Sequence, residues 1–181
     1  MTTLPDQLTI HDKTFVPFIS EIAIQERVEA LAQQISVDYA DRCPLLVVVL
    51  NGAAIFGADL LKNITVPCEI TFIRVASYQQ TASTGELKQI LGLTESVAGR
   101  DLIIVEDIVD TGLTMADVCR QMRLQDPASI AIATLLFKPD ALQEELELDY
   151  VGFEIGNRFV VGYGLDYDGL GRNTKAIYVL E

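Results

Sequence analysis

Residues 102–114 read LIIVEDIVDTGLT. An uninterrupted apolar run over 102–105 leads into two adjacent carboxylates, Glu106 and Asp107, and then into a small polar turn that begins at Asp110. A continuous apolar run is typical of a strand that is buried on both faces, as in a parallel sheet. The stretch therefore predicts a buried strand over 102–105, two carboxylates at its end, and a turn that opens a helix.

The same alternation of strand and helix extends in both directions. Ser20 is placed to cap a helix whose apolar residues recur at steps of four, three and four. The remaining predicted elements are a strand over 45–50 (LLVVVL), a helix over 53–62, a strand over 68–75, a helix that ends near residue 125 and a strand over 129–137. Alternating strands and helices predict an α/β fold with a mostly parallel sheet and right-handed crossovers.

Two regions interrupt this alternation. Residues 76–87 (ASYQQTASTGEL) are small and polar and are interpreted as a long loop, which in a compact domain is often a lid or a binding loop. From residue 150 onward, short predicted strands are separated by glycine-rich turns. We expect a single domain over 1–181, with a core over about 37–150 and a small hood built from about 1–20 and 151–181.

Composition restricts the possible functions. The chain has 181 residues and a formal net charge of −13, which argues against a nucleic-acid-binding surface because such a surface needs a basic stripe. No apolar run is long enough to span a membrane, and no signal peptide is apparent. The three cysteines are widely spaced and are interpreted as packing residues. These features predict a reduced, cytoplasmic protein that binds neither membrane nor nucleic acid.

The chemistry of the central stretch points to a sugar phosphate. Ligands of open α/β sheets bind beyond the carboxyl ends of the strands. A turn over 110–114 would present backbone N–H groups and two hydroxyls at the start of a helix, which suits a phosphate. Glu106 and Asp107 would suit vicinal hydroxyls or a hydrated Mg²⁺. The alternative is that Asp110 only caps the helix and that the strand ends in solvated acids.

Four segments carry a resemblance to a known family. VEDIVDTGLT (105–114) resembles the phosphoribosyl diphosphate (PRPP) motif of type I phosphoribosyltransferases. VVVLNGAAIFGADL (47–60), SYQQTASTGELK (77–88) and the segment 151–173 resemble the pyrophosphate loop, the lid and the base-binding segment of hypoxanthine-guanine phosphoribosyltransferases. The resemblance implies a doubly wound sheet with a hood. It also implies Mg²⁺-dependent transfer of the phosphoribosyl group from PRPP to hypoxanthine or guanine, which gives IMP or GMP and pyrophosphate in purine salvage.

The resemblance implies a role for each residue of the PRPP motif. Glu106 and Asp107 would hold the ribose hydroxyls with Mg²⁺ nearby, and the turn would cradle the 5′-phosphate. Asp110 would also act as general base or acid at N7 of the purine. The implied PRPP and nucleotide-binding residues are Glu106, Asp107, Ile108, Val109, Asp110, Thr111, Gly112, Leu113 and Thr114.

Further roles follow from the other matching segments. Lys138 would contact O6 of the base, Phe159 would stack on the ring and Val160 would pair with its edge through the backbone. Asp166 would lie in the base region and bind a second Mg²⁺. The implied pyrophosphate ligands are Asn51, Gly52 and Arg172, and the implied lid residues are Ser77 and Tyr78.

The chain departs from the family pattern at two places. Relatives often carry Lys or Arg before the glycine of the pyrophosphate loop, where this chain has the neutral Asn51. Leu170 and Gly171 stand where relatives commonly have aromatics. The resemblance further implies a cis peptide bond between Leu50 and Asn51, and a homodimer or homotetramer.

Three other functions compete with this interpretation. A relative acting on xanthine would share the same motifs, since Lys138 does not separate the 6-oxopurines. A regulatory protein that senses PRPP while binding nucleic acid would keep the fold, but the acidity argues against it. A nicotinamide dehydrogenase would need G-x-G-x-x-G after a strand, whereas Gly162 and Gly164 lie in a late segment rich in short strands.

Overall fold

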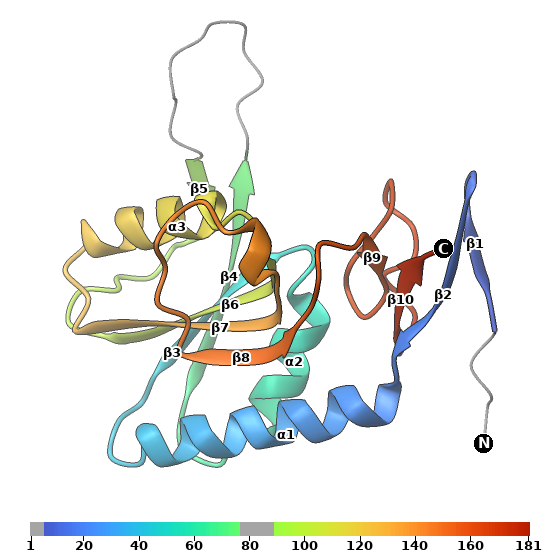
Figure 1. Cartoon of the computed structure of the whole chain (residues 1–181). Coiled ribbons are helices and arrows are strands. Elements are labelled where there is room, and N and C mark those ends of the chain that lie inside the picture. The colour runs from blue at the N-terminus through green and yellow to red at the C-terminus, as the bar shows by residue number, and fades with distance from the viewer. Residues whose placement is uncertain (1–5, 77–88) are drawn as a thin grey trace, which may run out of the picture.

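The computed structural model describes residues 6–76 and 89–181, and it contains two sheets and three α-helices within those ranges (Figure 1). The larger sheet has the order β5-β4-β3-β6-β7-β8. Its five parallel strands are β4 (Glu69–Ala76), β3 (Leu45–Leu50), β6 (Asp101–Val109), β7 (Ser129–Phe137) and β8 (Tyr150–Glu154). The short β5 (Gln89–Leu91) pairs antiparallel with β4 at one edge.

The order of the parallel strands reverses beside β3. The chain runs from β3 outward to β4 and then returns to the other side of β3 for β6, β7 and β8. In open α/β sheets, ligands bind beyond the carboxyl ends of the strands at such a reversal. The carboxyl ends of β3 and β6 are therefore the place where the topology predicts a site.

Helices cover both faces of this sheet. α1 (Glu21–Asp38) and α2 (Ala54–Asn63) pack on one face, and α3 (Leu113–Arg123) packs on the other (Figure 1). The strands supply alternate side chains to the two cores, so that Leu46 and Val48 join α1 and α2 while Val47 and Val49 join α3. Neighbouring residues of β3 are buried on opposite faces, which explains its uninterrupted apolar sequence.

The second, four-stranded sheet forms the hood. It has the order β1-β2-β10-β9, with β1 (Leu8–Ile10), β2 (Lys13–Ile19), β9 (Val160–Val161) and β10 (Ile177–Leu180). All three pairings are antiparallel, and they join the first described strands to the last (Figure 1). A hydrogen bond from the Tyr163 hydroxyl to Asp59 Oδ2, 2.6 Å long, connects the hood segment to α2.

The predicted fold class is confirmed, and several element boundaries need correction. Ser20 does cap α1, because its hydroxyl accepts a hydrogen bond from the Ala23 N–H at 3.2 Å. The predicted strands over 45–50 and 129–137 are confirmed. The strand predicted over 102–105 continues to Val109, because β7 pairs with it along that length.

The segment after residue 150 is the second correction. It was expected to enter the hood, but its first part forms β8, the outer parallel strand of the main sheet beside β7. Gly152 lies in this strand, and a Cβ there would come within 2.3 Å of the Leu135 carbonyl oxygen. Close approach of two backbones explains why a glycine stands in a strand. The hood thus takes β9 and β10, and not the whole segment.

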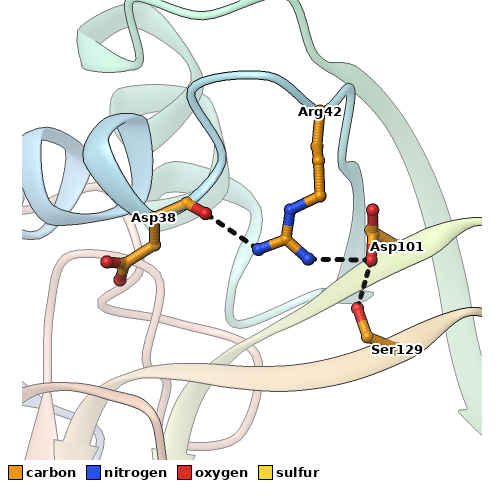
Figure 2. Close-up of polar contacts among 4 residues, drawn as sticks. All are labelled: Asp38, Arg42, Asp101 and Ser129. Carbon is orange, nitrogen blue, oxygen red and sulfur yellow. Dashed lines mark hydrogen bonds and ion pairs between the residues drawn. The ribbon is translucent and has the colours of Figure 1, made fainter.

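A polar network lies at the amino ends of β6 and β7, opposite the expected site. Arg42 donates to Asp101 Oδ1 at 3.2 Å and to the Asp38 carbonyl at 2.8 Å, and the Ser129 hydroxyl donates to the same Asp101 oxygen (Figure 2). The network connects the end of α1 to the first residues of β6 and β7. Because the Arg42 side chain is 45% exposed and its charge is screened by solvent, we expect its ion pair to contribute at most about 1 kcal/mol.

Three sequence expectations concern the chain more widely. None of the helices within residues 6–76 and 89–181 has the length and apolar character needed to cross a membrane. The cysteines are all free: Cys119 is buried, Cys68 is half-buried and Cys43 is exposed. The predicted lid residues Ser77 and Tyr78 lie outside the described residues.

Candidate active site

The turn after β6 forms a small cavity at the start of α3. Gly112 is the N-cap residue of α3 and has a φ of 79°, a conformation that glycine adopts without a Cβ penalty. The first N–H groups of a helix lack intrahelical acceptors and carry partial positive charge, so they favour an anion. The cavity has a volume of about 100 Å³, and its walls are Glu106, Ile108, Val109, Asp110, Thr111, Gly112, Thr114 and Met115.

Asp110 forms an ion pair with Lys138 from the end of β7. Its Oδ2 accepts a hydrogen bond from Lys138 Nζ at 2.8 Å. The Lys138 side chain is only 9% exposed, whereas that of Asp110 is 45% exposed. The backbone fixes the pair as well, because the Lys138 N–H donates to the Val109 carbonyl at 2.9 Å. Since Asp110 contacts Lys138 and α3 has no side-chain cap, the capping alternative is wrong.

A larger cavity lies beside the first, between the main sheet and the hood. Its volume is about 270 Å³. Phe159 is 44% exposed on its wall and packs edge-on against Tyr167, with ring centroids 5.8 Å apart. An apolar wall facing a few charged groups is the usual character of a small-molecule site. The lining residues are Asp107, Ile108, Asp110, Lys138, Phe159, Val160, Leu165 and Asp166.

The two cavities share part of their lining. Ile108 and Asp110 line both of them. A ligand that has a phosphate in the small cavity and a flat ring in the large one would therefore pass over Asp110. A nucleoside monophosphate has this form, since its ribose separates the phosphate from the base.

Glu106 and Asp107 lie inside β6, next to both cavities. Glu106 is buried, and its Oε1 accepts from the Asp107 N–H at 3.1 Å. Asp107 Oδ1 accepts from the Ile108 N–H at 2.8 Å. Burial raises the pKa of Asp107 above its ordinary value, while hydrogen bonds and the charge of Arg172 partly offset that rise. The two acids are therefore held inward and are not solvated at the end of a strand.

This raised pKa predicts a gain in stability on neutralisation. A carboxyl whose pKa is raised on folding destabilises the fold when ionised, and that cost disappears as pH falls through the folded-state pKa. We expect Asp107→Asn to raise Tm at pH 7–8 and to lose this advantage in acid, as measured by calorimetry on ligand-free protein. Asp168→Asn, at a carboxyl that is 85% exposed, is the control. A Tm difference independent of pH would contradict the assignment.

Two glycines and an arginine form the corner beyond β3. A Cβ at Gly52 would lie 1.5 Å from Asp107 Oδ2, so the Asp107 carboxylate occupies the space that a side chain would need. A Cβ at Gly164 would lie 2.0 Å from the Gly52 carbonyl oxygen. Arg172 donates to the Gly164 carbonyl at 2.5 Å and forms an ion pair with Asp166 at 2.6 Å. The hood segment therefore contacts the turn that follows β3 directly.

Asn51 is joined to an arginine that the sequence analysis missed. The Leu50–Asn51 peptide bond is cis, as the resemblance implied. Arg74 of β4 donates from Nη2 to Asn51 Oδ1 at 2.9 Å. The sequence contains no local signal for this contact, because the two residues are brought together only by the register of β3 and β4.

The donor set suits a magnesium ion that is shared with substrate. No group of three or more His, Cys, Asp or Glu side chains in the described parts of the chain is arranged to hold a metal alone. Mg²⁺ in phosphate-transferring sites is commonly bound by one or two carboxylates together with water and substrate oxygens. Glu106 and Asp107 provide an adjacent pair of this kind, whereas Asp166 is engaged by Arg172 and by the Gly169 N–H at 2.7 Å.

Most of the predicted site residues converge on these two cavities and the adjoining corner. Leu113 is an exception, since it is 44% exposed and lines neither cavity. Leu170 and Gly171 also lie outside both linings, and Gly171 packs against Ile10 of the hood. Leu165 lines the larger cavity and was not predicted. Its position depends on a turn in which Gly162 and Leu165 exchange backbone hydrogen bonds.

Comparison with known proteins agrees with this geometry. The family model that describes the phosphoribosyl transferase domain matches residues 20–168. The chain belongs to this phosphoribosyltransferase family. A hypoxanthine-guanine phosphoribosyltransferase of Bacillus subtilis (strain 168) is 45% identical over 164 residues, which cover 90% of this chain and 91% of the relative. The protein is thus a phosphoribosyltransferase, and the resemblance seen in its sequence is confirmed.

Solved structures of related phosphoribosyltransferases share the fold. A hypoxanthine-guanine phosphoribosyltransferase from Bacillus anthracis superposes with a TM-score of 0.85 at 36% identity, covering 91% of this chain and 98% of that one. A hypoxanthine phosphoribosyltransferase from Staphylococcus aureus also gives 0.85, at 38% identity, covering 91% of this chain and 90% of that one. The doubly wound sheet with its hood is therefore the architecture of this phosphoribosyltransferase.

Proposed function

We propose that this phosphoribosyltransferase transfers the 5-phosphoribosyl group of PRPP to hypoxanthine and guanine, giving IMP or GMP and pyrophosphate for purine salvage. The observation that carries the proposal is the Asp110–Lys138 ion pair. Both side chains line the larger cavity, and Asp110 also lines the small cavity formed by the turn over 110–114. O6 and N7 are neighbours on one edge of a 6-oxopurine. The Lys138 ammonium and the Asp110 carboxylate are 2.8 Å apart, a spacing that suits these two neighbouring atoms. The ammonium would donate a hydrogen bond to O6, and the carboxylate would accept the N7 proton.

Each step of the transfer has a residue suited to it. The turn over 110–114 would hold the 5′-phosphate, and Glu106 and Asp107 would accept hydrogen bonds from the ribose hydroxyls. Phe159 would stack on the base and the Val160 backbone would meet its edge. Asp110 would take the proton from N7, which makes the base nitrogen a better nucleophile as the C1′–pyrophosphate bond breaks. Asn51, Gly52 and Arg172 would bind the departing pyrophosphate.

Magnesium belongs to the same proposal. Glu106 and Asp107 would share one ion with PRPP, and Asp166 would bind a second ion on the pyrophosphate side. These ions would supply charge neutralisation for the phosphates. Such neutralisation would explain how a chain of net charge −13 binds a substrate that carries several negative charges. We also propose a cytoplasmic homodimer or homotetramer. Sedimentation would test the assembly.

The test is a spectrophotometric assay with PRPP and Mg²⁺, in which hypoxanthine, guanine, xanthine and adenine are offered separately. Turnover of hypoxanthine or guanine, but not of adenine, is the expected result. Dominant turnover of xanthine would keep the mechanism and change the specificity. Absence of turnover with every base, in folded protein that binds PRPP, would contradict the proposal and favour a PRPP-sensing role.

Lys138 should set the preference for 6-oxopurines. We expect Lys138→Gln to lower kcat/KM for hypoxanthine by about 10- to 100-fold, the worth of a charge-assisted hydrogen bond. Discrimination against adenine should also shrink, because an amide oxygen accepts from a 6-amino group and an ammonium does not. Steady-state kinetics with both bases measure the ratio. Lys175→Gln, at an exposed lysine paired with Glu21, is the control, and an unchanged ratio in Lys138→Gln would refute the role.

A further inference from the structure

Arg74 lies at the carboxyl end of β4, next to the turn that follows β3. The two strands are hydrogen-bonded neighbours, and Arg74 is in register with Leu50, the last residue of β3. The guanidinium reaches over this end of the sheet and donates from Nη2 to Asn51 Oδ1 at 2.9 Å. Residues from two adjacent strands therefore meet at the Asn51–Gly52 turn.

Arg74 differs from Lys138 and Arg172 in its partner. Lys138 is paired with Asp110, and Arg172 is paired with Asp166. Within the described ranges, no ion pair includes Arg74, and its side-chain hydrogen bond goes to a neutral amide. In a chain of net charge −13, a cation at the site without a carboxylate partner leaves its charge available to an anionic ligand.

The turn does not depend on Arg74 for its shape. The Ala53 N–H donates to the Val49 carbonyl at 3.2 Å, and the Ala54 N–H donates to the Asn51 carbonyl at 3.3 Å, so backbone bonds form the turn. Gly52 is held against Asp107 on one side and Gly164 on the other. Arg74 itself is exposed. An exposed arginine whose removal leaves the turn's own bonds intact is better suited to a ligand than to support of the fold.

We propose that Arg74 binds the pyrophosphate group of PRPP and the pyrophosphate product at the Asn51–Gly52 turn, and that Asn51 orients its guanidinium. The inference rests on the proposed function, whose pyrophosphate site it completes. A guanidinium has five N–H donors in a fixed plane, and Asn51 occupies one of them. The remaining donors match phosphate oxygens.

The experiment is titration calorimetry with inorganic pyrophosphate and MgCl₂ on the full chain. We expect Arg74→Gln to raise Kd by about 10-fold or more, the worth of a charge-assisted hydrogen bond. Arg74→Lys, which keeps the charge but loses the planar fork of donors, should give a Kd between those of Arg74→Gln and the unsubstituted protein, and Asn51→Lys combined with Arg74→Gln should recover part of the loss. Arg100→Gln removes the same charge at the opposite end of the sheet, where Arg100 pairs with Glu69, and should leave Kd unchanged.

Kinetics on the same proteins give a second measurement. KM for PRPP should rise in Arg74→Gln in parallel with Kd, while KM for hypoxanthine changes little. An Arg74→Gln protein that binds pyrophosphate normally overturns the proposal. So does a Kd that is as high in both charge-bearing variants as in Arg74→Gln alone, because a cation at the turn would then contribute nothing to binding. Titration needs no turnover, so a protein that binds pyrophosphate through Arg74 but transfers to no purine would refute the proposed function alone.

Discussion

Asp110→Asn should lower kcat by about 10²-fold or more, the range of a lost general base. Asparagine has nearly the same shape and still accepts a hydrogen bond from Lys138, but it cannot take the N7 proton. The cavity residues around it are unchanged, so binding of PRPP should persist. Single-turnover kinetics with hypoxanthine and saturating PRPP would measure the chemical step, independently of product release.

The matched control for this change is Asp117→Asn. Asp117 lies on α3 just after the same turn and pairs with Arg120 on the surface, so the variant removes an equal charge near the site. Its chemical step should match that of the unsubstituted protein. If Asp110→Asn kept a normal single-turnover rate, Asp110 would not be the base, and its pairing with Lys138 would serve only to orient that cation.

Gly164→Ala should be the most destabilising substitution at the site. A Cβ at this position would overlap the Gly52 carbonyl, and the backbone φ of 106° is one that residues with side chains rarely adopt. Strain and overpacking together predict a loss of about 3–5 kcal/mol. For a chain of this length, that loss corresponds to a fall in Tm on the order of 10 °C. Scanning calorimetry measures it directly.

Two other glycines separate the causes. Gly169 also has a positive φ, 83°, but a Cβ there would meet nothing within 4 Å. Gly156 has open space without a positive φ. We expect Gly169→Ala to cost part of the loss and Gly156→Ala almost none. Equal Tm values for all three variants would show that the hood and the Gly52 turn are not in tight contact.

The sequence predicted the elements whose pattern is set by burial alone. β3 and β7 are apolar along their length because neighbouring residues are buried on opposite faces, so their bounds followed from composition. The end of β6 did not follow, because Glu106 and Asp107 resemble a solvated strand end. In the structure they remain in the strand, where backbone N–H groups and the wall of the cavities accommodate them.

The parts of the site that escaped prediction depend on strand pairing. β8 is a five-residue strand that contains a glycine, and it was assigned to the sheet only by its pairing with β7. Arg74 contacts Asn51 because the register of β3 and β4 places Arg74 opposite Leu50, and no local sequence pattern encodes that register. The roles of the PRPP-motif residues and of Lys138 were predicted from the family resemblance, while their position at the ends of recognisable strands indicated only where a site would lie. Their pairing distances, and the sharing of Asp110 by two cavities, came only from the three-dimensional arrangement.

The strand order of the hood has a consequence for folding during synthesis. β2 is made early, but it pairs with β10, whose residues leave the ribosome more than a hundred positions later. Until then, one edge of β2 presents unpaired N–H and carbonyl groups, which favour association with other chains. The main sheet and α1 to α3 are complete in sequence before β9. A nascent chain can therefore hold a formed turn at residues 110–114 while Phe159 still lacks the sheet that positions it. Pausing late in translation should promote aggregation through β2.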